Sequence, residues 1–200
     1  RQKIIMIQGD SDDYALLEKW SKDFDCAGHY SVEIGVREGQ GSKTIMDNVK
    51  NNYLHIGVDP YGDLDYQHFD NQEDFSWEGC EKGKAPTYSD RMRDQMVKDF
   101  SEYAVRGKFH FANMKDIEFM KHPVYSGLKY SFIFLDGPHT TKDVLSEAIW
   151  FASRSAKNTR MIFDDYLYYK MDLIEECLSH FGFKQLERGK NKFCMEKHGD

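Results

Sequence analysis

Two apolar stretches of the sequence end abruptly in acidic residues. In SFIFLDGPH the apolar run is followed by Asp136, and a Gly-Pro turn separates Asp136 from His139. In RMIFDDY the apolar run is followed by Asp164 and Asp165. If the two stretches are neighbouring strands of one parallel sheet, all three carboxylates lie at the same edge. Carboxylates within a few ångströms repel one another, so one must be protonated or a cation must be present. Hard oxygen ligands of this kind suit Mg²⁺ or Ca²⁺.

The pair Asp164 and Asp165 imposes a geometric condition on this interpretation. Consecutive residues of a strand point to opposite faces, so both acids can bind one ion only if the strand has ended before them. The following Tyr166 and Leu167 permit such an ending. The alternative is that one acid forms a turn or caps the next helix. His139 also has two interpretations, as a reactive imidazole or as a hydrogen-bonded turn residue.

A glycine-rich loop follows an earlier strand-like segment, in VEIGVREGQGSKT. Its glycines are Gly35, Gly39 and Gly41, a spacing that differs from the GxGxxG of dinucleotide-binding folds, so a nicotinamide dehydrogenase is disfavoured. Glu33 would repel a pyrophosphate but suits a ligand with positive charge or hydroxyl donors. Asp59, about twenty residues after the loop, could accept both hydroxyls of a ribose, or it could form a turn before Pro60. Together these features favour a ligand that contains a nucleoside.

The stretches VEIGVREGQGSKT and HIGVDPYGD resemble motifs I and II of the class I S-adenosylmethionine-dependent methyltransferases. The resemblance covers nearly the whole chain. It implies that Glu33 and the glycines surround the methionine end of the cofactor and that Asp59 binds the ribose. The residues that it places at the cofactor are Glu33, Gly35, Val36, Gly39, Ser42, Asp59, Pro60, Asn113, Met114 and Asp136.

The segments LDGPH and FDDY resemble the metal-binding acids of cation-dependent O-methyltransferases of the catechol, caffeoyl-CoA and macrolide-sugar types. The DGxH pattern also occurs in a broad group of methyltransferases, and His139 stands where catechol-type enzymes have a lysine. The resemblance implies that Asp136, Asp164 and Asp165 bind Mg²⁺ or Ca²⁺. The chemistry of methyl transfer gives His139, together with Asp136, a catalytic role. A neutral imidazole could take the proton of an acceptor hydroxyl, and a nearby cation would keep it uncharged.

Alternating strand-like and helix-like patterns predict the elements that position these residues. The predicted strands span residues 30–36, 53–59, 108–114, 130–136, 159–165, 183–189 and 191–197, and the predicted helices span 11–24, 41–50, 89–106, 141–156 and 171–181. This pattern indicates one α/β domain over residues 1–200, with a doubly wound, mostly parallel seven-stranded sheet and helices on both faces. The resemblance implies the strand order 3-2-1-4-5-7-6, with the last strand antiparallel.

Residues 60–88 interrupt the alternation with a polar, acidic and aromatic stretch. Long stretches without regular structure are uncommon in compact domains and often cover binding sites, so we expect an inserted lid or substrate loop. Its aromatic side chains could instead form a local core or contact a second subunit in a homodimer.

Composition limits the classes of partner. The net charge of −7 disfavours a nucleic-acid surface, and no apolar stretch approaches the ~20 residues that span a bilayer. The first residues contain too short an apolar run for a signal peptide, and the four dispersed cysteines indicate reduced thiols in a cytoplasmic protein.

The leading hypothesis is methyl transfer to a small-molecule hydroxyl, with a metal-independent methyltransferase, a hydroxylase-like relative and a non-catalytic cofactor-binding module as alternatives.

Overall fold

A seven-stranded sheet forms the centre of the computed structural model, which describes residues 13–199. Its strands are β1 (Tyr30–Ile34), β2 (His55–Val58), β3 (Phe109–Ala112), β4 (Tyr130–Leu135), β5 (Ser155–Phe163), β6 (Phe183–Arg188) and β7 (Phe193–Lys197). They lie in the order β3-β2-β1-β4-β5-β7-β6, and β7 is antiparallel to both of its neighbours. The predicted fold class and strand order are therefore confirmed.

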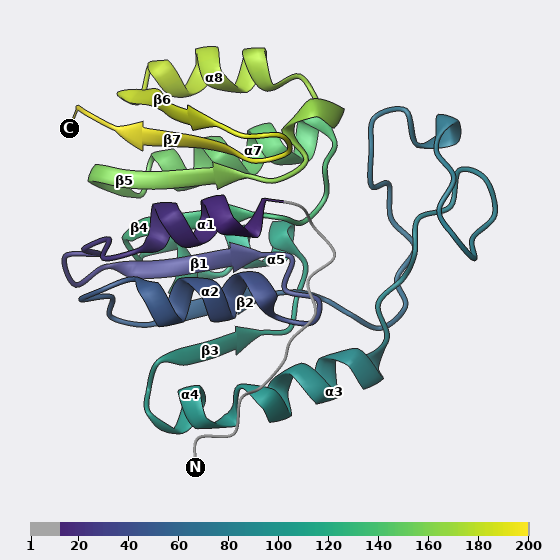
Figure 1. The fold of residues 1–200 in the computed structure, drawn as a ribbon, viewed down its shortest axis with the longest axis horizontal. Coiled ribbons are helices and arrows are strands. Elements are labelled where there is room, and N and C mark those ends of the chain that lie inside the picture. The colour runs from purple at the N-terminus through teal and green to yellow at the C-terminus, as the bar shows by residue number, and fades with distance from the viewer. Residues whose placement is uncertain (1–12, 200) are drawn as a thin grey trace.

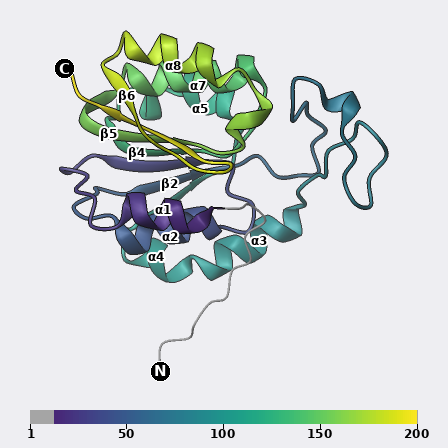
Figure 2. The same ribbon diagram turned by 45° about the horizontal axis from the view of Figure 1, so that its top comes forward.

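Helices cover both faces of the sheet. Figure 2 shows α5 (Asp116–Lys121), α7 (Thr141–Ala152) and α8 (Met171–Ser179) on one face, and α1 (Tyr14–Ser21), α2 (Gln40–Asn48), α3 (Asp90–Asp99) and α4 (Ser101–Val105) on the other. A short α6 (Pro123–Ser126) follows α5. No helix within residues 13–199 combines the length and the apolarity that crossing a bilayer requires. All four cysteines are free thiols, as predicted.

The central strand β4 shows why an uninterrupted apolar run forms a strand here. All six of its residues are buried, and their side chains alternate between the two layers of the core. Ile133 and Leu135 belong to the cluster beneath α7 and α8, whereas Phe132 and Phe134 belong to the cluster that includes α1 residues. A parallel strand covered on both faces needs apolar side chains at every position, so it lacks the alternation of a half-exposed strand.

Three predicted elements differ from the structure. The helix predicted over 89–106 is two helices, because the backbone leaves helical geometry at Phe100, whose buried ring packs against Phe109. Strand β5 begins at Ser155 rather than at 159, and the preceding helix ends at Ala152. The turn-like residues before position 159 are an irregularity inside β5, where Asn158 has a φ of 69°. Helices α5 and α6 were not predicted, and the predicted helix start at Ser11 lies outside the described residues.

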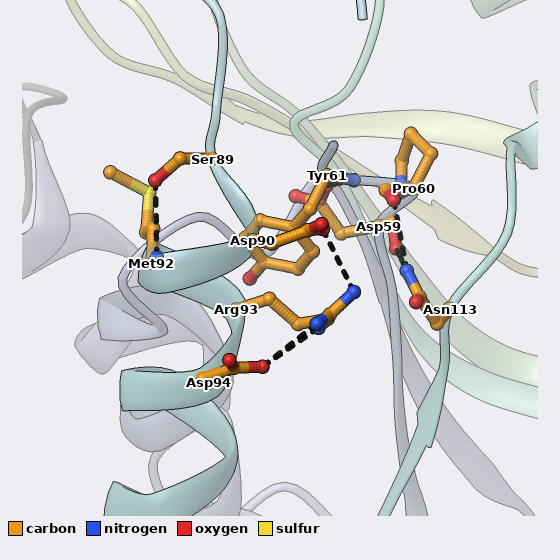
Figure 3. Close-up of polar contacts among 9 residues, drawn as sticks. All are labelled: Asp59, Pro60, Tyr61, Ser89, Asp90, Met92, Arg93, Asp94 and Asn113. Carbon is orange, nitrogen blue, oxygen red and sulfur yellow. Dashed lines mark hydrogen bonds and ion pairs between the residues drawn. The ribbon is translucent and has the colours of Figure 1, made fainter. Parts of the chain in front are cut away.

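Residues 60–88 leave the edge of the sheet toward which the arrowheads of the parallel strands point (Figure 1). Their regular structure is limited to η1, a single 3₁₀ turn at Gln72–Asp74. The two ends of the segment meet, since the Asp63 amide donates to the Tyr88 carbonyl oxygen at 2.8 Å and the Thr87 hydroxyl donates to the Asp63 carboxylate at 3.0 Å. Immediately afterwards the Ser89 side chain caps α3 by accepting a bond from the Met92 amide (Figure 3).

Candidate active site

A cavity of about 590 Å³ lies at the carboxyl edge of the sheet. Four of its wall residues, Gly35, Asp59, Asp136 and Asp164, follow the ends of β1, β2, β4 and β5. Others come from the 60–88 segment, from α5 and the residue before it, and from the first half of α7, namely Leu64, Tyr66, Gln67, His68, Tyr88, Lys115, Asp116, Ile117, Met120, Lys142, Asp143 and Ser146. Ligands of open α/β sheets bind at this edge, so the cavity is the candidate active site.

The sequence-predicted site residues divide into two groups in the structure. Those on the cavity wall are Gly35, Asp59, Pro60, Asp136, His139, Asp164 and Asp165. Those that do not line the cavity are Glu33, Val36, Gly39, Ser42, Asn113 and Met114. Val36 belongs to an apolar cluster below the loop, and Met114 packs against the main core. The second group therefore supports the wall from behind.

Gly35 is the point at which the glycine loop touches the end of β4. Its φ of 87° lies in the left-handed region, and a Cβ atom at this position would collide with the carbonyl oxygen of Asp136. The Asp136 amide in turn donates to the Ile34 carbonyl oxygen at 2.8 Å. Only glycine combines this φ with such a close approach of two backbones, so the loop and Asp136 are held side by side.

Glu33 lies in a buried polar chain beneath the same loop. It accepts a hydrogen bond from the Ser42 hydroxyl, and that hydroxyl lies 2.9 Å from Nε2 of the fully buried His55. Nδ1 of His55 lies 2.9 Å from the Ser31 hydroxyl. A Cβ atom at Gly41 would collide with the Glu33 carboxyl group. Glu33 therefore fixes the start of α2, and it does so without facing the cavity.

Replacing Glu33 with glutamine should make the protein more stable than wild type at alkaline pH and about equally stable near pH 5. Burial raises the pKa of Glu33 from 4.5 to about 8. Folding therefore favours the protonated acid, and this contribution is complete below about pH 4.5 and is lost as the pH rises through 8. Glutamine avoids the loss, which amounts to about 2–4 kcal/mol. Urea unfolding between pH 5 and 9 measures the difference, with the exposed Glu18→Gln as control; parallel profiles for all three proteins would contradict it.

Asp59 connects the glycine loop to the turn after β2. Its carboxylate accepts bonds from the amides of Val36 at 3.0 Å, Arg37 at 3.1 Å and Tyr61 at 3.0 Å. The Asn113 side chain, which follows β3, donates to the carbonyl oxygens of Asp59 at 3.0 Å and Pro60 at 2.9 Å (Figure 3). A carboxylate has about four acceptor sites, so Asp59 retains capacity for a ligand hydroxyl. Asn113 positions this turn from outside the cavity.

The three predicted acids lie around His139 rather than around one common point. The His139 Nε2 atom is 3.7 Å from Asp136 Oδ1, and its Nδ1 atom is 3.7 Å from Asp165 Oδ2. Strand β5 ends before the acid pair, and Asp165 adopts a left-handed φ of 49°, so the two consecutive side chains do not alternate as in a strand. Donor atoms within 4.8 Å of one another form two groups, one of Asp136, His139 and Asp164, the other of His68, His139 and Asp165.

The pKa values of the neighbouring acids Asp136 and Asp164 are shifted in opposite directions. Burial and the neighbouring Asp164 carboxylate raise the pKa of Asp136 well above its usual value. Burial alone would raise the pKa of Asp164, but the hydrogen bond from Asp136 and the ammonium of Lys192 lower it. Lys192 is fully buried and its Nζ lies 2.5 Å from Asp164 Oδ1. The pair is therefore one neutral acid beside one carboxylate that carries its own cation.

His139 is a buried and neutral imidazole. Burial lowers its pKa to about 4, and within residues 13–199 its Nε2 atom has no hydrogen-bond partner. The 60–88 segment lies against it, since the His139 amide donates to the His68 carbonyl oxygen at 2.8 Å and the two rings approach to 3.4 Å between Nδ1 and His68 Nε2. A neutral imidazole with an unpaired nitrogen at the wall of a cavity can accept a proton from a ligand.

The expected shell of three carboxylates for Mg²⁺ or Ca²⁺ does not match this arrangement. The acids fall into two groups that share His139, and the Lys192 ammonium already binds Asp164. An imidazole is a poor ligand for either of these hard cations. Within residues 13–199 the three acids thus do not gather as one group of donor atoms, and no catalytic step is assigned to a metal ion here.

Sequence reasoning did not find Lys192, Ile117 or Met120 as site residues, and it did not place His68 against His139. His68 lies in a segment without periodicity, and Ile117 and Met120 lie in a helix that was not predicted. Lys192 offered one signal, a lysine at the start of the apolar closing strand, in KNKFCMEK. A long charged side chain beside consecutive buried positions is rare without a partner.

Comparisons with known proteins identify the family and the fold. The sequence model of the family described as "Methyltransferase domain" matches residues 32–166. No curated protein matches the chain. A Corynebacterium glutamicum protein of solved structure has a TM-score of 0.60 at 12% identity, over 96% of this chain and 84% of its own.

Two further solved structures extend the comparison. The O-methyltransferase from Bacillus cereus in complex with SAH has a TM-score of 0.55 at 10% identity, over 96% of this chain and 84% of its own. The N-methyltransferase NodS from Bradyrhizobium japonicum has a TM-score of 0.53 at 7% identity, over 92% of both chains. Because O- and N-methyltransferases share the fold, the likeness does not select the acceptor atom. The family match covers more than half of the chain, and we conclude that it belongs to the methyltransferase domain family and has the fold of the class I S-adenosylmethionine-dependent methyltransferases.

Proposed function

We propose that the protein transfers the methyl group of S-adenosylmethionine to a hydroxyl oxygen of a small molecule, with His139 as the general base. The observation that carries the proposal is the buried neutral His139, which borders the same cavity as the glycine loop and Asp59 and whose Nε2 has no hydrogen-bond partner within residues 13–199. Family membership supports the cofactor. A base beside the methyl donor supports a hydroxyl acceptor, because an alcohol must lose its proton as it is methylated.

The wall residues fit the parts of S-adenosylmethionine. Asp59 suits the ribose hydroxyls, and the apolar side chains of Ile117 and Met120 suit a flat purine. The close approach at Gly35 leaves the backbone of the loop free of a side chain that would fill the space. The Bacillus cereus O-methyltransferase, solved with SAH, has the same fold and supports this assignment.

The chain's own residues account for the movement of the proton. When bound, S-adenosylmethionine supplies a methyl group to the acceptor oxygen, and the electron pair of the broken carbon–sulfur bond stays on the sulfur. His139 Nε2 takes the hydroxyl proton as the new carbon–oxygen bond forms. The imidazolium so produced lies 3.7 Å from a carboxyl oxygen of Asp136 and 3.7 Å from a carboxyl oxygen of Asp165. The Asp165 carboxylate stabilises its charge, and the Asp136 oxygen faces the nitrogen that has taken the proton. Asp136 thereby contributes to catalysis, as the sequence predicts.

Assistance by Mg²⁺ or Ca²⁺, which the sequence also predicts, is not part of this mechanism. Its role would be to neutralise the acid cluster and to stabilise the developing alkoxide. Lys192 already places a cation on Asp164. The metal requirement thus stays a prediction, and the titrations described below test it.

Calorimetry tests the proposed cofactor. The purified protein should bind S-adenosylmethionine and S-adenosylhomocysteine but not NAD. Turnover is then tested by S-adenosylhomocysteine release with catechol, caffeic acid and simple hexoses as acceptors, and with their fully O-methylated analogues as controls without a free hydroxyl. Absence of binding to S-adenosylmethionine would remove the proposal, whereas binding without turnover on any acceptor would favour the non-catalytic module.

We further propose that residues 60–88 act as a lid over the acceptor. Phe69 pairs with His139 in an isolated bridge, and Asp70 accepts bonds from the Thr141 amide at 3.0 Å and the Thr141 hydroxyl at 2.5 Å. The ring of Phe69 packs on Tyr168, with centroids 4.7 Å apart. These contacts place the segment against the start of α7 and beside the proposed base.

Replacing Asp70 with alanine should loosen the lid. Two hydrogen bonds to a carboxylate are lost, each worth about 1.5–3 kcal/mol, so limited proteolysis within 60–88 should become about tenfold faster or more. The exposed Asp74, in the same segment, provides the matched Asp74→Ala control. Equal cleavage rates in the two variants would show that Asp70 does not fasten the segment. Trypsin digestion followed by mass spectrometry measures the rates.

A further inference from the structure

Lys192 reaches the active site from the strand that closes the sheet. The antiparallel register pairs Phe163 of β5 with Phe193 of β7, so residue 192 lies opposite residue 164, just beyond the paired strands. The Lys192 side chain is fully buried, and its Nζ lies 2.5 Å from Asp164 Oδ1. The pairing of β5 with β7 therefore places the Lys192 ammonium beside Asp164, the acid that follows β5.

Two aromatic rings near Lys192 also suit a fixed positive charge. Its Nζ lies 4.8 Å from the ring centre of Tyr14 and 5.6 Å from that of Phe134. Aromatic faces attract cations without adding a charge of their own. A fully buried ammonium is costly unless a carboxylate compensates it, so Lys192 and Asp164 depend on each other.

The acid cluster needs such a charge. Asp136, Asp164 and Asp165 all lie near His139, and carboxylates this close cannot all be ionised without a neutralising cation. In a cation-dependent site a divalent ion supplies the neutralisation and also fixes the carboxylates in place. Here the Lys192 ammonium is already paired with Asp164, one of the carboxylates that such an ion would need.

We propose that Lys192 is the built-in cation of this active site, positioning Asp164 and taking the place of a divalent metal ion. The proposal rests on the proposed function for its meaning in catalysis, since Asp164 and Asp136 border the proposed base. Lys192 acts through Asp164 and is a positioning residue. Its charge makes methyl transfer by the wild-type protein independent of added Mg²⁺ or Ca²⁺.

Isothermal titration of the full chain with MgCl₂ and CaCl₂ tests this role without relying on turnover. Wild-type protein should show no saturable binding at millimolar concentrations. Lys192→Met, which keeps the apolar stem but removes the charge, should gain binding by at least about tenfold, the lower end of what one neighbouring charge does to the protonation of a carboxylate. Lys197, a second buried lysine on β7 that donates to the Ser155 carbonyl oxygen at 2.8 Å, gives the matched control Lys197→Met, which should behave as wild type.

The outcomes separate this inference from the proposed function. Adding Asp164→Asn to Lys192→Met should abolish the gained binding, and Lys192→Arg should not gain it. Folded Lys192→Met that binds cations no better than wild type would overturn the inference. If Lys192→Met does not fold, the wild-type titration decides: saturable binding that Asp164→Asn removes would overturn it, and absence of binding supports it. Failure to bind S-adenosylmethionine would remove the proposed function but would leave the cation result intact.

Discussion

Replacing His139 with alanine should lower the turnover number by a factor of about 10²–10⁴, the usual contribution of a general base. Affinity for S-adenosylmethionine should stay within about twofold, because no atom of the His139 ring is assigned to the cofactor. The exposed His180, at the end of α8, provides the control His180→Ala. Initial rates and calorimetry on the same preparations measure the two effects. Equal turnover in the two variants would remove His139 as the base.

The pH dependence of turnover follows from the same residue. Burial lowers the pKa of His139 to about 4, so the imidazole is neutral and able to accept a proton throughout the physiological range. The turnover number should therefore be flat above about pH 6 and fall only as the pH decreases toward 4, where the imidazole becomes protonated. An inflection near the ordinary histidine value of about 6.5 would contradict a buried base.

Replacing Gly35 with alanine should destabilise the fold by about 3 kcal/mol or more and abolish binding of S-adenosylmethionine. The added Cβ would be strained at a φ of 87° and would also collide with the backbone of Asp136. The collision would separate the loop after β1 from the end of β4, and these two segments border the same cavity.

Gly28 allows the two effects at Gly35 to be distinguished. It has a similar φ of 78°, but a Cβ atom there would meet nothing within 4 Å. Gly28→Ala should therefore cost only the backbone strain, about 1 kcal/mol, and leave cofactor binding unchanged. Urea unfolding and calorimetry on both variants measure the difference. Similar losses of stability would mean that the close approach to Asp136 is not the decisive feature.

The fold was predictable because its signals are local. Continuous apolar runs such as the six buried residues of β4 specify strands covered on both faces, and the glycines after β1 specify the tight turn into α2. The elements missed or misplaced depend on tertiary contacts. Helix α5 is a short six-residue segment, and β5 continues through a left-handed Asn158 that resembles a turn. Propensity alone does not report that a neighbouring strand pairs across such an irregularity.

The candidate site was predictable only in part, for a physical reason. Acids at strand ends could be placed at one edge from topology, and Asp136, His139 and Asp164 do lie together. Sequence does not specify which long-range neighbour neutralises them. Lys192 meets Asp164 through the pairing of β5 with β7, across 28 residues of chain. Burial of Glu33 and Ser42 beneath the loop likewise depends on how closely α2 packs, which their spacing did not reveal.

The neck formed by Asp63, Thr87 and Tyr88 has a consequence for the evolution of this protein. Because the ends of the 60–88 segment are joined by hydrogen bonds, the chain leaves and returns to the edge of the sheet at one place. Closing such a loop becomes only slightly less favourable as it lengthens, by about 0.6 kcal/mol for each doubling. The segment is in effect an interchangeable module, and under the lid role proposed above, grafting a different one onto the same neck would alter the choice of acceptor.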